Sequence, residues 1–308
     1  MPEILKALNE GTAGDGGYIV PEQFSAKVLE LVQAQTVVVP DLEQVQMTTD
    51  TLRIPKVTAG STAYLVSELG TITSSQLGFG ETVLYPKKFA ALIEASTELE
   101  EDNIVGVADV LVNQMARDLA IKIDNEIFNG AGGTTFAGLR YTGSFTNSVA
   151  ADGTIGGTQS AAISLTPISK AIDEVLKDNH SQPDVSYFNP RTIGSLRLLT
   201  DSTSRPMLNM ETWGSPLLRE GVIGTLMGTK LKPAANIPVN LTYGAQTGCT
   251  DAIVGVSKMF GYYAVRRNVT FKRDYVISTD RNQYQVTLRS AFAVKYPDAY
   301  CVIRSITN

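Results

Sequence analysis

The chain has 308 residues, 43% of them hydrophobic and 19% charged, an ordinary globular composition that suffices for one large domain or two subdomains. Its formal net charge of -5 argues against a general polyanion-binding surface but not against a local basic patch. Two cysteines, Cys249 and Cys301, are too few for a disulfide framework and favour a reducing compartment.

The N-terminus carries no signal for secretion or membrane insertion. Met1 to Lys6 lacks the basic start and apolar core of a signal peptide. No run of about eighteen apolar residues exists that could span a bilayer. We therefore expect a soluble protein made in the cytoplasm, with no membrane partner.

The first 58 residues predict an arm followed by strands. Gly11 to Gly17 is a glycine-rich segment that cannot bury much by itself, so we expect it to be flexible. An amphipathic helix is predicted from about Pro21 to Gln35. Residues 36–58 predict strands, including Thr51 to Val57.

Residues 58–85 predict a projecting two-stranded hairpin. The stretch is rich in glycine, serine and threonine, and its short apolar pieces include Tyr64, Leu65, Leu77 and Phe79. An isolated hairpin of this kind is only marginally stable in water. We therefore expect it to dock on another subunit.

Residues 86–130 predict a strand followed by one long helix. The alternation from Phe89 to Ala95 is typical of a half-buried strand. An apolar series from Ile104 to Ile127, spaced by three and four residues, then predicts a helix that begins at Asp102 or Asn103 and stops at Gly130. At a rise of about 1.5 Å per residue it would be roughly 40 Å long, so it needs a long partner surface.

The rest of the chain predicts a compact α/β unit and then long strands. The α/β unit is expected to contain a helix over 165–176, a buried strand over 185–188, a turn at Asn189-Pro190-Arg191 into a helix over 192–200, and a strand within 231–239. Strands are expected over 268–273, 284–288, 293–296 and 300–303, with a turn near 280–282.

No catalytic, cofactor or metal site is predicted. The single histidine, His180, is expected in a solvated loop, and the cysteines lack both metal spacing and a neighbouring histidine. The glycine-rich segments lack the Lys-Ser/Thr of a phosphate loop. The acids from Glu98 to Asp102 are explained by the start of the long helix, which favours negative charge.

Two further features have two interpretations each, a contact with another molecule or packing within the chain. Arg266, Arg267, Lys272 and Arg273, with neighbouring aromatic residues, could bind nucleic acid, but alternation along a strand explains them more simply. Trp213 is either a loop anchor at an intersubunit contact or part of local packing. A mobile arm, a projecting hairpin, a long helical rod and no catalytic constellation together indicate an assembly protein.

The order of the motifs resembles one family of shell proteins. Gly16 to Pro21 followed by an amphipathic helix resembles that family's arm entry. Asp124 to Gly130, with Phe136 to Leu139 shortly after, is similar to the end of its spine helix. Three more segments resemble the strand, turn, helix, loop and strand of its axial domain: Tyr187 to Thr192 with Leu196 and Leu199, Pro216 to Leu218, and Gly228 to Leu231. The family is the major capsid protein of tailed bacterial and archaeal double-stranded DNA viruses, with the Hong Kong ninety-seven type fold.

The resemblance implies an α+β phage capsid fold with an N-terminal arm, an extended β-hairpin loop, a peripheral domain and an axial domain. The implied divisions are the arm over 1–35, peripheral strands over 36–57, the extended loop over 58–85, the spine helix and its strand over 86–130, the axial domain over 131–262, peripheral strands over 263–289, and a return to the axial domain over 290–308.

The implied function is structural rather than enzymatic, without cofactors. The chain would self-assemble as pentamers and hexamers into an icosahedral shell in the virion, around weakly and non-specifically held double-stranded DNA, after synthesis in the host cytoplasm. Candidate intersubunit contacts are Tyr64, Leu65, Leu77, Phe79, Arg53, Lys56 and Trp213. Alternatives are an encapsulin-type compartment with protein cargo and, less favoured because histidine and cysteine are scarce, a small-molecule enzyme.

The chain departs from the family pattern in two ways, which change the expected scaffold and the expected way of locking the shell. Some members carry a long N-terminal scaffolding segment, whereas this chain starts almost at the arm, so a separate scaffold or a trimmed segment is expected, beside a portal and a decoration protein. Some members cross-link through a lysine on the extended loop, but no lysine lies between Lys56 and Lys87. We therefore expect a noncovalently locked shell.

Overall fold

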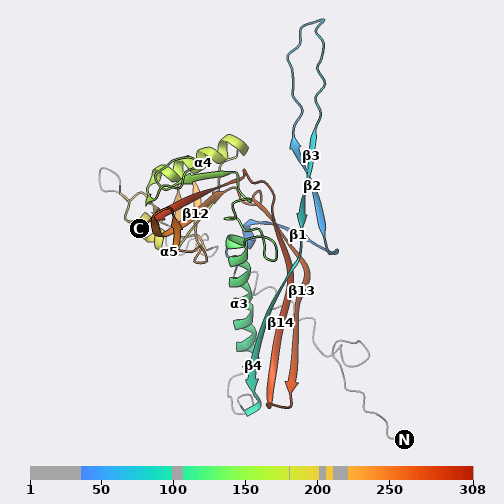
Figure 1. Cartoon of the computed structure of the whole chain (residues 1–308). Coiled ribbons are helices and arrows are strands. Elements are labelled where there is room, and N and C mark those ends of the chain that lie inside the picture. The colour runs from blue at the N-terminus through green and yellow to red at the C-terminus, as the bar shows by residue number, and fades with distance from the viewer. Residues whose placement is uncertain (1–35, 99–106, 180, 201–205, 211–220, 308) are drawn as a thin grey trace.

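The computed structural model describes residues 36–98, 107–179, 181–200, 206–210 and 221–307. These residues form two lobes, each built on its own sheet, and a long hairpin that projects away from both (Figure 1). Several predicted features lie outside the described residues: the arm and its helix over 1–35, most of the acids before the long helix, His180 and Trp213.

The first lobe is a four-stranded sheet with one long helix packed on it. Its strand order is β1-β13-β14-β4, with β1 at Glu43–Gln46, β13 at Gly261–Val276, β14 at Arg281–Val294 and β4 at Lys87–Ser96. The predicted turn near 280–282 is confirmed, because β13 and β14 pair antiparallel up to Val276 opposite Arg281. Strand β4 pairs antiparallel with β14 along its whole length, as the alternation from Phe89 to Ala95 requires.

The predicted long helix is α3, Val107–Asn129, which lies along this sheet (Figure 1). Met115, Leu119, Ile123 and Ile127 form its buried face and pack with Phe89 and other residues of β4, β13 and β14. The spacing of four residues places these side chains on one stripe of the helix. The described 23 residues span about 35 Å at 1.5 Å per residue, so the sheet supplies the long partner surface that such a helix needs.

The chain turns back on itself where α3 ends, and the predicted stop of the helix at Gly130 is confirmed. The N–H groups of Leu139 and Arg140 donate to the carbonyls of Ile127 and Phe128, at 2.8 and 3.0 Å, and so pair acceptors that the helix leaves open. This return brings backbone against backbone, because a Cβ atom on Gly138 would lie 2.6 Å from the Gly130 nitrogen. Only a residue without a side chain fits there.

The second lobe is a mixed nine-stranded sheet. Its main order is β5-β15-β12-β7-β10-β9-β8, with β6 beside β15 and β11 beside β12. The bounds are β5 Asn147–Ala150, β6 Ala161–Ala162, β7 Val185–Phe188, β8 Asn209–Met210, β9 Gly224–Leu226, β10 Thr229–Pro233, β11 Leu241–Tyr243, β12 Gln246–Gly255 and β15 Tyr300–Thr307. Helix α4, Leu165–Asn179, buries Ile168, Ala171 and Val175 in the core of this sheet.

Helix α5 spans Pro190–Arg197. It begins after the predicted turn, but the predicted C-terminal end of the helix was wrong. Asn189 caps it by accepting from the Arg191 N–H at 2.9 Å. The helix was expected to reach Thr200, but Leu198 is its C-cap, and the Leu198 side chain is 82% exposed. Apolar periodicity at 196 and 199 continued past the point where the backbone leaves the helix. The strand expected within 231–239 is likewise shifted, to β10.

A chain of aromatic rings joins the two lobes into one core. The ring centroids of Phe128 on α3 and Tyr187 on β7 are 5.4 Å apart, and those of Tyr187 and Phe260 are 6.4 Å apart. Phe260 in turn lies 6.1 Å from Tyr300 on β15. Edge contacts of this kind add to the burial of large apolar surfaces. The end of α3 is therefore fixed against both sheets.

A buried carboxylate, Asp124, and a partly buried one, Asp41, hold the segment that enters this core, Val37 to Leu42. The segment includes the short helix η1 at Val39–Asp41. Asp41 accepts the Tyr187 hydroxyl and forms an ion pair with Lys232 Nζ at 2.8 Å. Asp124 on α3 accepts the Val37 N–H at 2.7 Å. Burial raises the pKa of Asp124 to about 6, even though the Val37 and Val38 amides favour its charged form.

We predict that Gly138→Ala destabilises the subunit, because the new methyl group meets the backbone of Gly130 and Phe128. Gly194→Ala in α5 is the matched control, since its methyl group meets nothing within 4 Å and alanine favours a helix by about 1 kcal/mol. Urea denaturation of both variants should move the midpoint in opposite directions. Equal midpoints would contradict the close approach at Gly138.

We predict that Asp124→Asn reduces the dependence of stability on pH between about 4 and 6. The folded pKa of Asp124, about 6, lies above its ordinary 3.8, so the protonated group favours the folded state and its contribution is lost as the pH rises through 6. The difference of about 2 units corresponds to at most about 3 kcal/mol. Asparagine stays neutral and can still accept from Val37.

The measurement is the free energy of unfolding at several pH values, with Asp118→Asn on the exposed face of the same helix as the control. Asp118→Asn should keep the slope of the unmutated chain. The same slope in all three proteins would show that Asp124 does not titrate in this range.

Candidate assembly surface

The projecting hairpin consists of β2, Leu52–Ala59, and β3, Gly78–Leu84. These strands pair antiparallel, from Leu52 opposite Leu84 to Ala59 opposite Gly78, and within the described residues they belong to no larger sheet. Only their base packs on the body: Leu84 is fully buried in a small cluster with Met47, Tyr262, Ala264 and Ala291. The predicted two-stranded hairpin is thus confirmed, but its first strand begins before the expected residue 58 and residues 60–77 form no strand. The hairpin is fixed at one end.

Beyond this base the hairpin exposes large apolar side chains. Leu65 and Leu69 are fully exposed, and Ile72 and Phe79 are 79% and 72% exposed. Tyr64 and Leu77 each expose about half of their surface. Scattered exposed apolar residues are normal, but a series along one projecting element marks an interaction site. Tyr64, Leu65, Leu77 and Phe79 are thus all exposed on the same projecting hairpin, and their contact with another subunit stays a prediction.

The two predicted charged contacts make interactions within the chain. Arg53 forms an ion pair with Glu81 across the hairpin at 2.8 Å, with both side chains largely exposed. A pair of this kind contributes little to stability. Lys56 Nζ donates to the carbonyl of Lys295 at 3.4 Å, near the base of the hairpin. In the hairpin register Lys56 lies opposite Gly80, next to Phe79, whereas Arg53 lies opposite Val83 and closer to the base.

Lys295 organises the body beneath the hairpin. Its Nζ donates to Glu43 at 2.5 Å and lies 5.1 and 5.6 Å from the ring centroids of Tyr262 and Tyr296. Partial burial disfavours the charged amine, but Glu43 and the two tyrosines outweigh it and raise the pKa of Lys295. Lys295 thus stays charged and links β1 to the end of β14.

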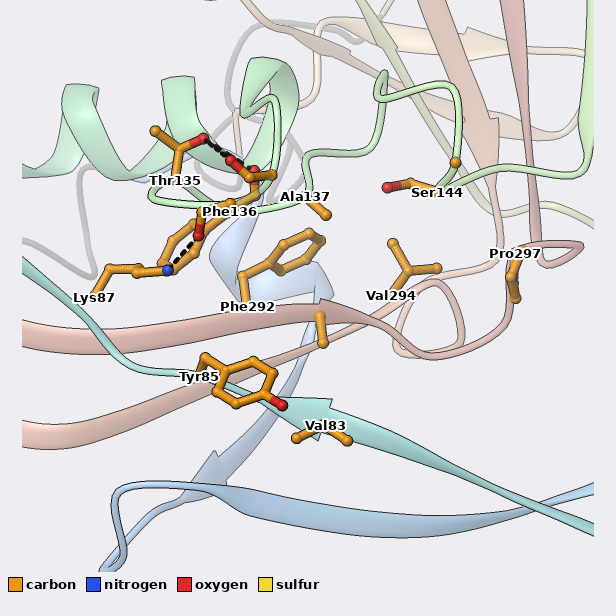
Figure 2. Close-up of a pocket in the computed structure, with 14 residues that line it drawn as sticks. Val83, Tyr85, Lys87, Thr135, Phe136, Ala137, Ser144, Phe292, Val294 and Pro297 are labelled. Atoms are coloured by element: carbon orange, nitrogen blue, oxygen red, sulfur yellow. Dashed lines mark hydrogen bonds between the residues drawn. The ribbon is translucent and has the colours of Figure 1, made fainter.

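An open hollow of about 320 Å³ lies where the hairpin meets the body (Figure 2). Its walls are mainly apolar, with Phe136, Phe292, Val294 and Pro297 from the body and Val83 and Tyr85 from the hairpin side. Lys87 lies at one end, where its Nζ donates to the Gly133 carbonyl at 2.6 Å. The sequence gave no indication of this hollow, because its walls come from four distant segments.

Sequence reasoning also missed several exposed apolar residues: Val57, Leu69, Ile72 and Tyr85. Leu69 and Ile72 lie in the same Gly-, Ser- and Thr-rich stretch as Tyr64 and Leu65, where few apolar neighbours are available to bury an apolar side chain. The same signal could therefore have identified them. Tyr85 is different, because its position at the hollow depends on how the hairpin meets the body.

Three of the four basic residues singled out in β13 interact with neighbours within the chain. Arg266 forms an ion pair with Asp50 at 2.8 Å, and Arg267 donates to Thr270. Arg273 lies over the ring of Tyr284, 5.5 Å from its centroid. These three arginines thus have local partners, which agrees with the interpretation of this segment as a strand.

The described residues provide no group of three potential metal ligands. Both cysteines are free and buried, and burial raises the pKa of the Cys301 thiol well above its usual range. No helix among the described residues is long and apolar enough to cross a membrane.

Solved structures share this architecture at low sequence identity. The capsid of an empty GTA particle matches with a TM-score of 0.67 and 15% identity, covering 98% of this chain and 100% of that chain. A chain of Gordonia phage Cozz matches with a TM-score of 0.64 and 16% identity, covering 100% of this chain and 97% of that one. For Mycobacterium phage Bobi the values are 0.64 and 17%, with coverage of 87% and 90%.

The family comparison agrees with the fold. No curated relative matches the chain. The model of the phage capsid family matches residues 16–305, nearly the whole length. The projecting hairpin, the long helix on a four-stranded sheet and the second mixed sheet are therefore features of a structural shell protein, and neither the encapsulin-type compartment nor the enzyme is favoured. The chain belongs to the phage capsid family.

Proposed function

We propose that the chain forms pentamers and hexamers that close into an icosahedral shell around viral double-stranded DNA, and that the hairpin of each subunit locks onto a neighbour. The observation that carries this proposal is the exposed apolar series on a hairpin that joins no larger sheet among the described residues. Burying one large aliphatic side chain contributes about 1.5–3 kcal/mol, reduced by the cost of ordering the loop. Repetition by symmetry multiplies this modest gain.

The proposed domain division follows the two sheets. The sheet of β1, β13, β14 and β4 with α3 is the peripheral domain, and the nine-stranded sheet with α4 and α5 is the axial domain. Residues 58–85 are the extended loop and residues 1–35 the arm. The axial domains would surround the fivefold and sixfold centres, and hairpins and arms would cross to neighbours.

The other proposed partners are the DNA inside the shell and the proteins that help to assemble and fill it. A chain with a net charge of -5 does not bind DNA strongly, so a motor would drive the DNA in and the wall would retain it. A separate scaffold, a portal and a decoration protein would assist assembly, and synthesis would take place in the host cytoplasm.

We expect a shortened hairpin to abolish shells without unfolding the subunit. Ala59 and Gly78 lie opposite each other in the hairpin register, so an Asn-Gly turn can replace residues 60–77 without disturbing the base. The variant should be soluble, with an unchanged circular dichroism spectrum, and electron microscopy should show no closed shells. Leu198→Ser, which removes an equally exposed leucine from the second lobe, is the control and should assemble. Normal shells from the shortened chain would refute the role of the hairpin.

We expect the assembled shell to be held noncovalently. The hairpin offers no lysine between Lys56 and Lys87 for an isopeptide bond, and both cysteines are buried. Reducing, denaturing electrophoresis of purified shells should therefore give one band at the monomer mass. A ladder of higher bands would contradict this expectation.

A further inference from the structure

The tip of the hairpin is a tight turn with one charge beside a leucine. The Gly70 N–H donates to the Ser67 carbonyl at 2.9 Å, which places Glu68 and Leu69 at the corner of the turn. Glu68 is the only charged residue from 58 to 80, and it is exposed. Leu69 beside it is fully exposed, and Leu65 and Ile72 flank the turn with more exposed apolar surface.

The hollow at the base of the hairpin has the complementary chemistry. Tyr85 is 57% exposed and Val294 and Pro297 are partly exposed, so they offer apolar surface above a floor formed by the buried Phe136 and Phe292. Lys87 supplies a positive charge at one end (Figure 2). Lys87 donates to a neutral carbonyl, that of Gly133, and within the described part of the chain it has no carboxylate partner. An acid that entered from outside would therefore meet an amine whose charge is not neutralised.

The tip cannot enter the hollow of its own chain. Glu68 at the corner lies nine positions after Ala59 in β2, a distance of about 30 Å at roughly 3.3 Å per residue. Figure 1 shows how far the hairpin projects, whereas Val83 and Tyr85, which line the hollow, lie where β3 returns to the body. A tip that enters the base of the next copy makes a head-to-tail contact, and such contacts close into rings when the rotation allows.

We propose that the turn at Glu68 and Leu69 of one subunit inserts into this hollow of a second copy. Leu69 packs against Tyr85 and Val294, over the floor that Phe136 and Phe292 form, and the Glu68 carboxylate pairs with Lys87. This inference rests on the proposed function, in which hairpins lock neighbouring subunits, and it assigns the receiving surface and the charge pair.

A disulfide between two introduced cysteines tests the contact. Ala137 lines the hollow and is exposed, so the double variant Leu69→Cys with Ala137→Cys should cross-link on oxidation. Nonreducing electrophoresis of sedimented particles should then show a ladder of linked subunits. Leu69→Cys with Thr279→Cys, in the exposed turn between β13 and β14, is the matched control and should remain monomeric. Native Cys249 and Cys301 are buried and give no background.

Charge reversal tests the pair independently. Glu68→Lys and Lys87→Glu should each lower the particle yield several-fold, and the two together should recover most of it. Lys88→Glu, next to the hollow but not part of its lining, should not be rescued by Glu68→Lys. A double variant that is no better than either single variant would overturn the pairing.

The outcomes separate this inference from the proposed function. Electron microscopy that shows closed particles without a cross-link at Ala137 would overturn the insertion and leave the shell function intact. Failure of the unmutated chain to assemble, with its scaffold supplied, would overturn the proposed function itself.

Discussion

The packing of α3 is the constraint on which the rest of the structure depends. Its apolar stripe covers one face of the four-stranded sheet, and its last turn brings Phe128 against Tyr187 of the second sheet. The return of the chain through Gly138 then pairs the last carbonyls of the helix. Because both lobes are fixed to the same helix, the base of the hairpin has a defined orientation relative to the whole body.

Buried polar groups make this junction specific. Asp41, Lys232 and Tyr187 interact with one another, and Asp124 binds the backbone of the segment that leads into η1. Removing one partner would leave an unpaired buried charge, so such groups tolerate little rearrangement. The segment at 37–42 is thus held by directional bonds to α3 and β10 rather than by apolar contact alone.

Unlike this junction, the hairpin is held to the rest of the subunit only at its base. Its base is buried in a small cluster around Leu84, whereas in the part of the chain that the structure describes nothing covers the large apolar side chains beyond Ala59. The same subunit therefore carries an exposed apolar tip and, at the far end of the hairpin, an apolar hollow. A shell protein benefits from this separation, because the tip of a subunit cannot reach the hollow of the same subunit.

The sequence by itself determined the elements whose periodicity is local: α3, the strand before it, the β13–β14 pair and the exposed residues Tyr64, Leu65, Leu77 and Phe79. It also determined the stop at Gly130 and the cap at Asn189, since these depend on neighbouring residues. The tertiary structure alone decided where α5 ends, that Arg53 and Lys56 interact within the chain, and that Tyr85, Phe136, Phe292 and Pro297 enclose a hollow. Those features depend on contacts between distant segments, and no local pattern encodes such contacts.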